Sequence, residues 1–118
     1  MTSEQTFEEF LDTLGSNQWL LKDAVTLCKL VELICPQFGC HVALTGGSLY
    51  KEGERKDCDL LFYRIRQVPA IDMAGLLVAL HRIGVSHVAG SGWCFKAKYR
   101  GKNVDMLFPE AVGGDYVP

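Results

Sequence analysis

The stretch from Asp57 to Tyr63 constrains the fold more than any other part of the sequence. It reads Asp-Cys-Asp-Leu-Leu-Phe-Tyr, so two carboxylates flank a cysteine before the chain becomes wholly apolar. A short apolar run of this kind is typical of a strand in the middle of a sheet. We therefore expect a central strand whose first residues, Asp57 and Asp59, lie at one sheet edge.

Two helices are expected before this strand. Thr6 and Glu9 match a capping box, which predicts a short first helix. A second helix is expected to begin after Ser16 or Asn17 and to end at Pro36. Its apolar stripe consists of Leu20, Ala24, Leu27, Val31 and Ile34.

The remaining elements follow from shorter patterns. Residues 41–45 are expected to form a buried strand before a glycine turn, and residues 93–99 and 103–108 to form a hairpin. Pro69 fits the first turn of a third helix, which ends at Gly84 and is apolar enough to be well buried. The apolar face of that helix comprises Ile71, Ala74, Leu77, Val78 and Leu80.

This order of elements predicts an α+β (mixed α/β) fold, with a small mixed sheet and helices packed on one face. A length of 118 residues allows one domain. We expect a helical N-terminus at 1–38, a core with the candidate site at 40–109 and a C-terminal loop at 110–118.

The net charge, the apolar stretches and the cysteines limit which partners and compartment the sequence predicts. A formal net charge of −2 gives no indication of nucleic-acid binding. No apolar stretch approaches the roughly 20 residues that cross a bilayer, and five cysteines without close paired spacing suit a reduced compartment. These features predict a cytoplasmic protein without a membrane partner. Zinc is not expected, because Cys35, Cys40 and His41 are loosely spaced and lack a fourth ligand.

Asp57 and Asp59 are the main candidates for chemistry. Period-two geometry places them on one face of their strand, about 6.5 to 7 Å apart, while Cys58 points to the other face. Two like charges this close are unfavourable unless a cation or a shared proton relieves them. Mg²⁺ (or Mn²⁺) is the expected ion because hard cations bind carboxylate oxygens. The alternative is a solvated strand end at which both charges face water.

Asp105 is the third candidate carboxylate. Alternation along the last strand places it on the same face as Asn103 and opposite Val104. Strands disfavour a lone aspartate, and burying its charge is costly, so it needs a partner. That partner is either the metal site or a salt bridge to Lys96 or Lys98. These lysines alternate with apolar residues, which indicates a polar outer face or, alternatively, a lining for phosphate.

The turn Gly46-Gly47-Ser48 follows the strand at 41–45. Glycines let backbone amides approach a ligand, and successive N–H groups in such a turn form an anion-binding concavity. Three basic residues between this turn and Asp57 are candidates for neutralising a triphosphate: Lys51, Arg55 and Lys56. The alternative is a tight connection without a ligand.

In this order, the residues resemble the polymerase-β-like nucleotidyltransferase superfamily. That family has a Gly-Gly or Gly-Ser turn after a strand, an Asp-x-Asp pair on the next strand and a third carboxylate on a later one. The matching segments are Gly46-Gly47-Ser48, Asp57-Cys58-Asp59-Leu60 and Val104-Asp105-Met106. The resemblance is nearest to the small antibiotic-type and minimal nucleotidyltransferases, some of which pair with a helical toxin partner. The spacing between Ser48 and Asp57 is short for this family.

The resemblance implies a reaction and a role for each site residue. Asp57 and Asp59 would bind metal ions that hold the nucleotide phosphates, and Asp105 would complete the second metal site and help to activate the acceptor. The turn at 46–48 would hold the β- and γ-phosphates. The implied reaction transfers a nucleoside monophosphate from a nucleoside triphosphate to an unidentified acceptor hydroxyl and releases pyrophosphate.

The size of the chain leaves a second function open. Larger family members carry a further domain for base and acceptor, and 118 residues leave no room for one. A protein partner or a homodimer mate is therefore expected to supply the acceptor site. The alternative is a catalytically inactive nucleotidyltransferase-fold module, such as an antitoxin or inhibitor that acts through a protein partner.

Overall fold

A computed structural model describes residues 19–46 and 56–110 of the chain. The expected first helix, with Thr6 and Glu9, lies outside these residues, as does the predicted loop beyond residue 110. Residues 109 and 110, the last that are described, are helical. No helix among the described residues is long and apolar enough to cross a membrane.

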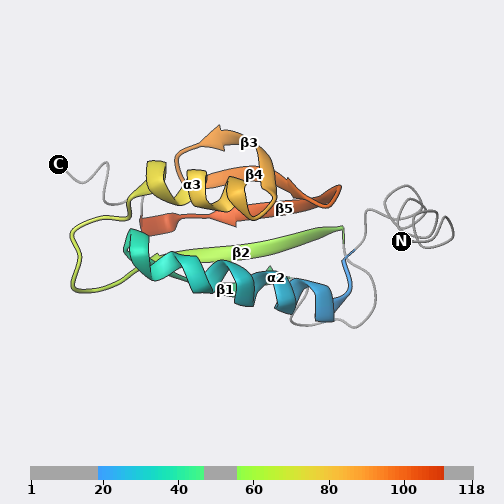
Figure 1. The fold of residues 1–118 in the computed structure, drawn as a ribbon, viewed down its shortest axis with the longest axis horizontal. Coiled ribbons are helices and arrows are strands. Elements are labelled where there is room, and N and C mark those ends of the chain that lie inside the picture. The colour runs from blue at the N-terminus through green and yellow to red at the C-terminus, as the bar shows by residue number, and fades with distance from the viewer. Residues whose placement is uncertain (1–18, 47–55, 111–118) are drawn as a thin grey trace, which may run out of the picture.

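The described chain forms one five-stranded sheet and two α-helices (Figure 1). In chain order the elements are α2 (Leu21–Ile34), a 3₁₀ turn η1 (Cys35–Phe38), β1 (Cys40–Thr45), β2 (Asp57–Arg64), α3 (Met73–Arg82), β3 (Val85–Ser91), β4 (Cys94–Tyr99) and β5 (Lys102–Leu107). The strand order is β1-β2-β5-β4-β3. Only β2 and β5 pair in parallel, and the other three pairs are antiparallel. The sheet is therefore mixed, which confirms the predicted fold class.

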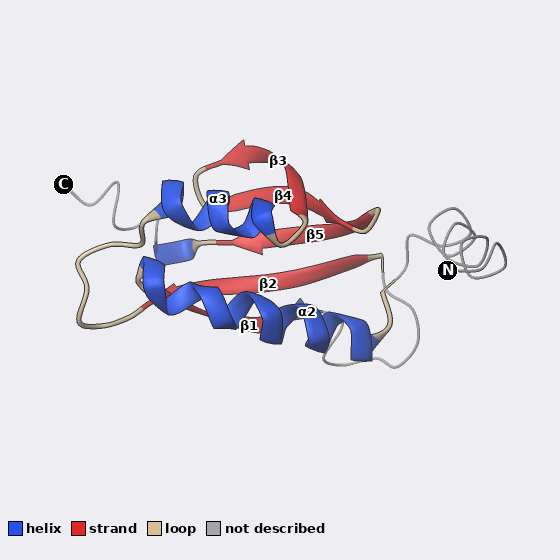
Figure 2. Cartoon of the chain, viewed as in Figure 1, coloured by secondary structure: helices blue, strands red, loops and turns tan. Residues whose placement is uncertain are grey.

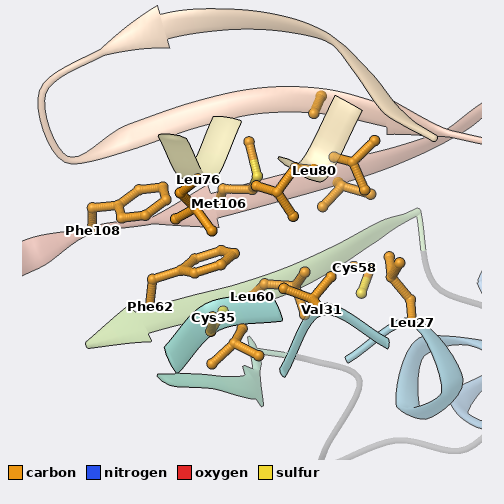
Figure 3. Close-up of a cluster of buried hydrophobic side chains, with 14 of the residues drawn as sticks. Leu27, Val31, Cys35, Cys58, Leu60, Phe62, Leu76, Leu80, Met106 and Phe108 are labelled. Atoms are coloured by element: carbon orange, nitrogen blue, oxygen red, sulfur yellow. The ribbon is translucent and has the colours of Figure 1, made fainter. Parts of the chain in front are cut away.

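Both helices lie on the same face of the sheet (Figure 2). The core lies between the two layers and includes side chains from α2, α3 and all five strands. Figure 3 shows its centre, where the rings of Phe62 and Phe108 stack with centroids 4.5 Å apart. At the N-terminal end, Trp19 is buried and its Nε1 donates a hydrogen bond to the carbonyl oxygen of Asn103. The opposite face of the sheet carries neither described helix.

The second predicted helix begins later than expected. Its first residue is Leu21, and Leu20 is the N-cap in an extended conformation. Leu20 is 40% exposed and so does not belong to the buried stripe. Ala24, Leu27 and Val31 do lie in the core as predicted. The α-helical part ends at Ile34, and Pro36 continues the chain into the 3₁₀ turn rather than stopping it.

The third helix also begins later, at Met73 instead of near Pro69. The reason is local: the Asp72 side chain accepts a hydrogen bond from the Gly75 amide at 3.0 Å and caps the helix there. The helix is also less buried than its apolar composition predicted. Leu76 and Leu80 face the core, whereas Val78 is 54% exposed. The choice of Ala74 and Val78 for the buried face was therefore wrong.

The predicted hairpin is present as β4 and β5, which pair from Cys94 with Leu107 to Tyr99 with Lys102. No strand was predicted between the helix end at Gly84 and this hairpin. The structure has one, β3, which pairs antiparallel with β4 and forms the sheet edge.

Candidate active site

The three candidate carboxylates lie on the two central strands that run in parallel. In the register of β2 and β5, Asp59 pairs with Asp105 and Asp57 pairs with Asn103. The intervening residues Cys58 and Val104 are fully buried in the core. Because side chains alternate along a strand, the carboxylates face the side of the sheet opposite α2 and α3. The same-face arrangement of Asp57 and Asp59 predicted from alternation is therefore present.

Asp59 is the most crowded of the three. Burial raises the pKa of its carboxyl, and the neighbouring charges of Asp105 and Asp57 and a hydrogen bond with Asp105 raise it further. Lys96 acts in the opposite direction. Two carboxylates that share a hydrogen bond need a proton or a cation between them, because two adjacent negative charges repel. The site therefore carries an excess of negative charge.

Lys96 relieves part of this excess. Its Nζ lies 3.0 Å from Asp105 Oδ1, across the β4–β5 pair. The hydrogen bond to Asp105, followed by the charge of Asp105, raises the pKa of Lys96. The salt bridge that the sequence left open as an alternative is thus present. The Lys96 side chain is 68% exposed, so solvent screens the pair and its contribution to stability is small.

Gly46 directly follows β1 and lies against the side chain of Asp59. Thr45 pairs with Asp59 in the β1–β2 register. Gly46 has a φ of +76°, which favours glycine, and a Cβ added there would overlap with Asp59 Oδ2. The glycine is therefore required by the position of the carboxylate, which links the predicted turn to the predicted carboxylate site.

Four of the candidate nucleotide-binding residues lie outside the described part of the chain: Gly47, Ser48, Lys51 and Arg55. Lys56 is described and is exposed immediately before β2. Gly46 and Lys56 are thus the members of this set that the structure places near the carboxylates.

A cavity of about 320 Å³ adjoins the carboxylates on the β4 side. It is lined by Asp57, His87, Lys96, Ala97, Lys98, Asn103 and Asp105. Lys98 Nζ donates a hydrogen bond to Asn103 Oδ1 instead of to a carboxylate. The sequence had placed Asn103 on the face of Asp105 and left Lys98 open as a phosphate lining. It assigned no role to His87, which was expected to be a satisfied or surface histidine. In the structure, the position of His87 depends on an irregularity in β3.

The donor atoms of the site suit a hard divalent cation. Oxygens of carboxylates are preferred by Mg²⁺, which usually takes one or two carboxylates and completes its shell with water and phosphate oxygens. Within residues 19–46 and 56–110, no group of three or more His, Cys, Asp or Glu side chains is placed to hold a metal ion. Among the described residues, the parallel register therefore offers a cation the paired carboxylates of Asp59 and Asp105, and it does not bring Asp57 into a three-carboxylate group with them.

Comparison with known proteins gives a likeness in structure but not in sequence. No family model matches the chain, and no curated protein matches it. Polymerase beta of Leishmania infantum, solved as a ternary P/T complex, superposes with a TM-score of 0.64 over 92% of this chain at 13% identity. Cid1, described as an RNA terminal uridylyl transferase, superposes with a TM-score of 0.58 over 93% of this chain at 12% identity.

The chain shares the fold of these two structures. The predicted resemblance is confirmed at the level of the fold. The chain covers 49% of the polymerase beta chain and 39% of the Cid1 chain. It thus spans half or less of the length of these two nucleotidyltransferase structures.

Proposed function

We propose that the protein transfers a nucleoside monophosphate from a nucleoside triphosphate to an acceptor hydroxyl, with release of pyrophosphate. The observation that carries this proposal is the pairing of Asp59 with Asp105 on the sheet face opposite α2 and α3, in a fold shared with polymerase beta. A purely structural pair of carboxylates would be unfavourable there, because each raises the free energy of the other's charged form. Binding of a cationic ligand explains why both are present.

Mg²⁺ or Mn²⁺, held by Asp59 and Asp105 with Asp57 beside them, would supply charge neutralisation at the nucleotide phosphates. The turn at 46–48 would bind the β- and γ-phosphates through its amides, and Lys51, Arg55 and Lys56 would offset their charge. We infer that Asp105 accepts the proton of the acceptor hydroxyl. The acceptor oxygen then bonds to the α-phosphorus, and the bond to the bridging oxygen breaks, so that pyrophosphate leaves with the electron pair.

Two neighbouring residues, Lys96 and Gly46, help to position the carboxylates. Lys96 holds Asp105 by the 3.0 Å contact and limits the repulsion between Asp105 and Asp59. Gly46 lets the β1 backbone approach the Asp59 carboxylate closely. Both residues therefore act on the position of the carboxylates and are expected to affect activity without touching the transferred phosphorus.

Transfer of a labelled nucleoside monophosphate to an acceptor tests this proposal. ATP, GTP, CTP and UTP, each labelled at the α-phosphate, are incubated with Mg²⁺ or Mn²⁺, a cell lysate as the source of acceptors, and the full chain or its Asp59→Asn variant. We expect one nucleotide to give a covalently labelled product with the unaltered chain, together with pyrophosphate, and none with the variant.

Asp23→Asn is the matched control, because Asp23 is on α2 on the opposite side of the sheet. This variant should label as the unaltered chain does. Equal labelling by the Asp59→Asn variant would contradict the proposed role of the carboxylates. Metal-dependent nucleotide binding without labelling by any of the four nucleotides would favour an inactive binding module.

A further inference from the structure

Helix α3 and the edge strand β3 are neighbours in the fold (Figure 1) and share a groove of about 350 Å³. The groove is lined by Leu77, Val78, His81, Arg82, His87 and Val88. His87 also lines the cavity beside the carboxylates. The other five residues have no part in the proposed nucleotidyl transfer, so the groove needs a separate explanation.

An irregularity in β3 shapes one wall of the groove. In the pairing of β3 with β4, two residues of β3, His87 and Val88, face the single residue Ala97. This is a β-bulge, which bends a strand and re-aims its side chains. Adjacent residues of a regular strand point to opposite faces of the sheet. The bulge therefore allows two consecutive side chains to line the same groove.

The floor of the groove is apolar and is only partly covered. Leu77 and Val88 are half-buried and pack against the core. Val78 is exposed over 54% of its surface, because Leu76 and Leu80 form the side of α3 that faces the core. Covering such side chains with another apolar surface is favourable. The floor therefore favours an occupant with apolar side chains.

The rim of the groove is basic. His81 and Arg82 are in the last turn of α3, and His87 lies on β3. All three are exposed, and none of the six lining residues is acidic. Arg82 forms no salt bridge with any residue of the described ranges 19–46 and 56–110. A segment that combines acidic and apolar side chains is therefore complementary to the groove.

Residues 1–18 of the same chain, which lie outside the described ranges, have this composition. They contain four acidic residues and no lysine, arginine or histidine, so the rest of the chain carries a formal charge of +2. The apolar residues of the short helix predicted there share one face: Phe7, Phe10, Leu11 and Leu14. Glu8 and Asp12 are four residues apart, so both lie along one border of that face.

The described chain begins close to the connection between α3 and β3. The rings of Trp19 and Tyr99 stack with centroids 6.3 Å apart. Tyr99 is opposite Val85, the first residue of β3, and its ring lies next to Gly84 in the connection that follows α3. Leu14 is five residues before Trp19, and five extended residues span up to about 17 Å. The N-terminal segment can therefore reach the groove of its own chain.

We propose that residues 6–14 dock into the groove between α3 and β3 of the same chain. The apolar face of the segment covers the floor, and its acidic side chains lie against Arg82 and the two histidines of the rim. The docked segment also covers the outer side of His87, and so forms part of the wall of the cavity beside the carboxylates. Docking requires neither a nucleotide nor a metal ion, so it is independent of the proposed nucleotidyl transfer.

Photo-cross-linking from the groove tests this placement. The full chain with Val78→benzoylphenylalanine is irradiated as an equal mixture of isotope-labelled and unlabelled protein, and mass spectrometry identifies the joined peptides. We expect cross-links from position 78 to residues 6–14 in which both peptides carry the same label. Leu33→benzoylphenylalanine is the matched control, because Leu33 is an apolar residue of α2 that is 76% exposed. It should give no cross-link to residues 6–14.

Substitutions in the cross-linking protein test the two kinds of contact. Leu11→Asp should abolish the cross-link, because it places a charge on the apolar face. Asp12→Lys and Arg82→Glu should each lower the yield about threefold, and the two together should restore it, since exposed opposite charges attract weakly. Arg66→Glu makes the same charge change at an exposed position after β2 and should leave the yield unchanged. Circular dichroism checks that each variant is folded.

Several results would overturn the proposal. Cross-links that join differently labelled peptides would assign the groove to a second copy of the chain. Cross-links confined to other segments, or none at all, would show that residues 6–14 do not occupy the groove. An unchanged yield in Leu11→Asp would do the same. If the substitution at Val78 prevents folding, His81→benzoylphenylalanine replaces it, because His81 is exposed and lines the same groove.

Discussion

The Asp59 carboxylate is required by the proposed function, but its charge lowers the stability of the folded protein. It is partly buried, and it faces one carboxylate across the β2–β5 pair and another on its own strand. Burial and these two charges raise the pKa of its carboxyl in the folded protein. An acid whose pKa is raised on folding favours the folded state most when it is protonated, so its ionisation at neutral pH lowers the free energy of unfolding.

Replacing Asp59 with asparagine is therefore expected to stabilise the protein at pH 7, by on the order of 0.5–1 kcal/mol. The gain should shrink as the pH falls through the raised folded-state pKa, and should vanish below the ordinary value of 3.8, where the native carboxyl is also neutral. Urea unfolding at pH 7 and pH 3.5 measures this difference. A variant less stable than the native chain at pH 7 would show that Asp59 has a structural role.

Gly46 depends on the same carboxylate. Gly46→Ala is expected to lower the free energy of unfolding by about 1–3 kcal/mol, because alanine is strained at a φ of +76° and its Cβ overlaps with Asp59 Oδ2. Thermal denaturation of the single variants and of Gly46→Ala with Asp59→Ala measures the coupling. Part of the loss should be recovered in the double variant. Simple additivity would mean that the two residues are independent.

At the residue scale, local patterns predicted which side chains share a face. Alternation alone placed Asp57 with Asp59 and Asn103 with Asp105. It could not predict that Asp59 faces Asp105, because that contact comes from parallel pairing of strands separated by a helix and two further strands. His87 was missed for a related reason. Its position comes from a bulge, which depends on the register of β3 against β4.

At the scale of elements, β2 and the hairpin were predictable because their patterns are regular, and the helix starts were not. Pro69 and Asp72 both carry signals for a helix start, and the cap at Asp72 prevails. The Asp72 amide also donates to the carbonyl oxygen of Phe38 at 2.9 Å, which ties the start of α3 to the turn η1. This tertiary contact is not visible in a local sequence pattern.

The cap at Asp72 can be measured directly. Asp72→Ala removes the acceptor of the Gly75 amide and is expected to lower the free energy of unfolding by about 1 kcal/mol. Asp72→Ser, which retains a capping oxygen, should lose much less. Denaturant unfolding of both variants provides the comparison. Equal losses of stability in the two variants would mean that Asp72 stabilises the protein by an interaction other than the cap.

At the scale of the whole molecule, the described helices both pack on one face of the sheet (Figures 1 and 2), and strand alternation places the carboxylates on the other face. The chain shares the fold of polymerase beta over 92% of its own length and 49% of that chain.

The central claim is that the carboxylates on the sheet face opposite α2 and α3 bind a nucleoside triphosphate together with a divalent cation. Calorimetric titration of ATP, GTP, CTP and UTP into the full chain, each with Mg²⁺, with Mn²⁺ and with a chelator, tests it most directly. We predict that at least one nucleotide binds only with metal present, and that Asp57→Ala and Asp59→Ala each abolish this binding. Failure of all four nucleotides to bind with either metal, or binding that survives both substitutions, would contradict the claim.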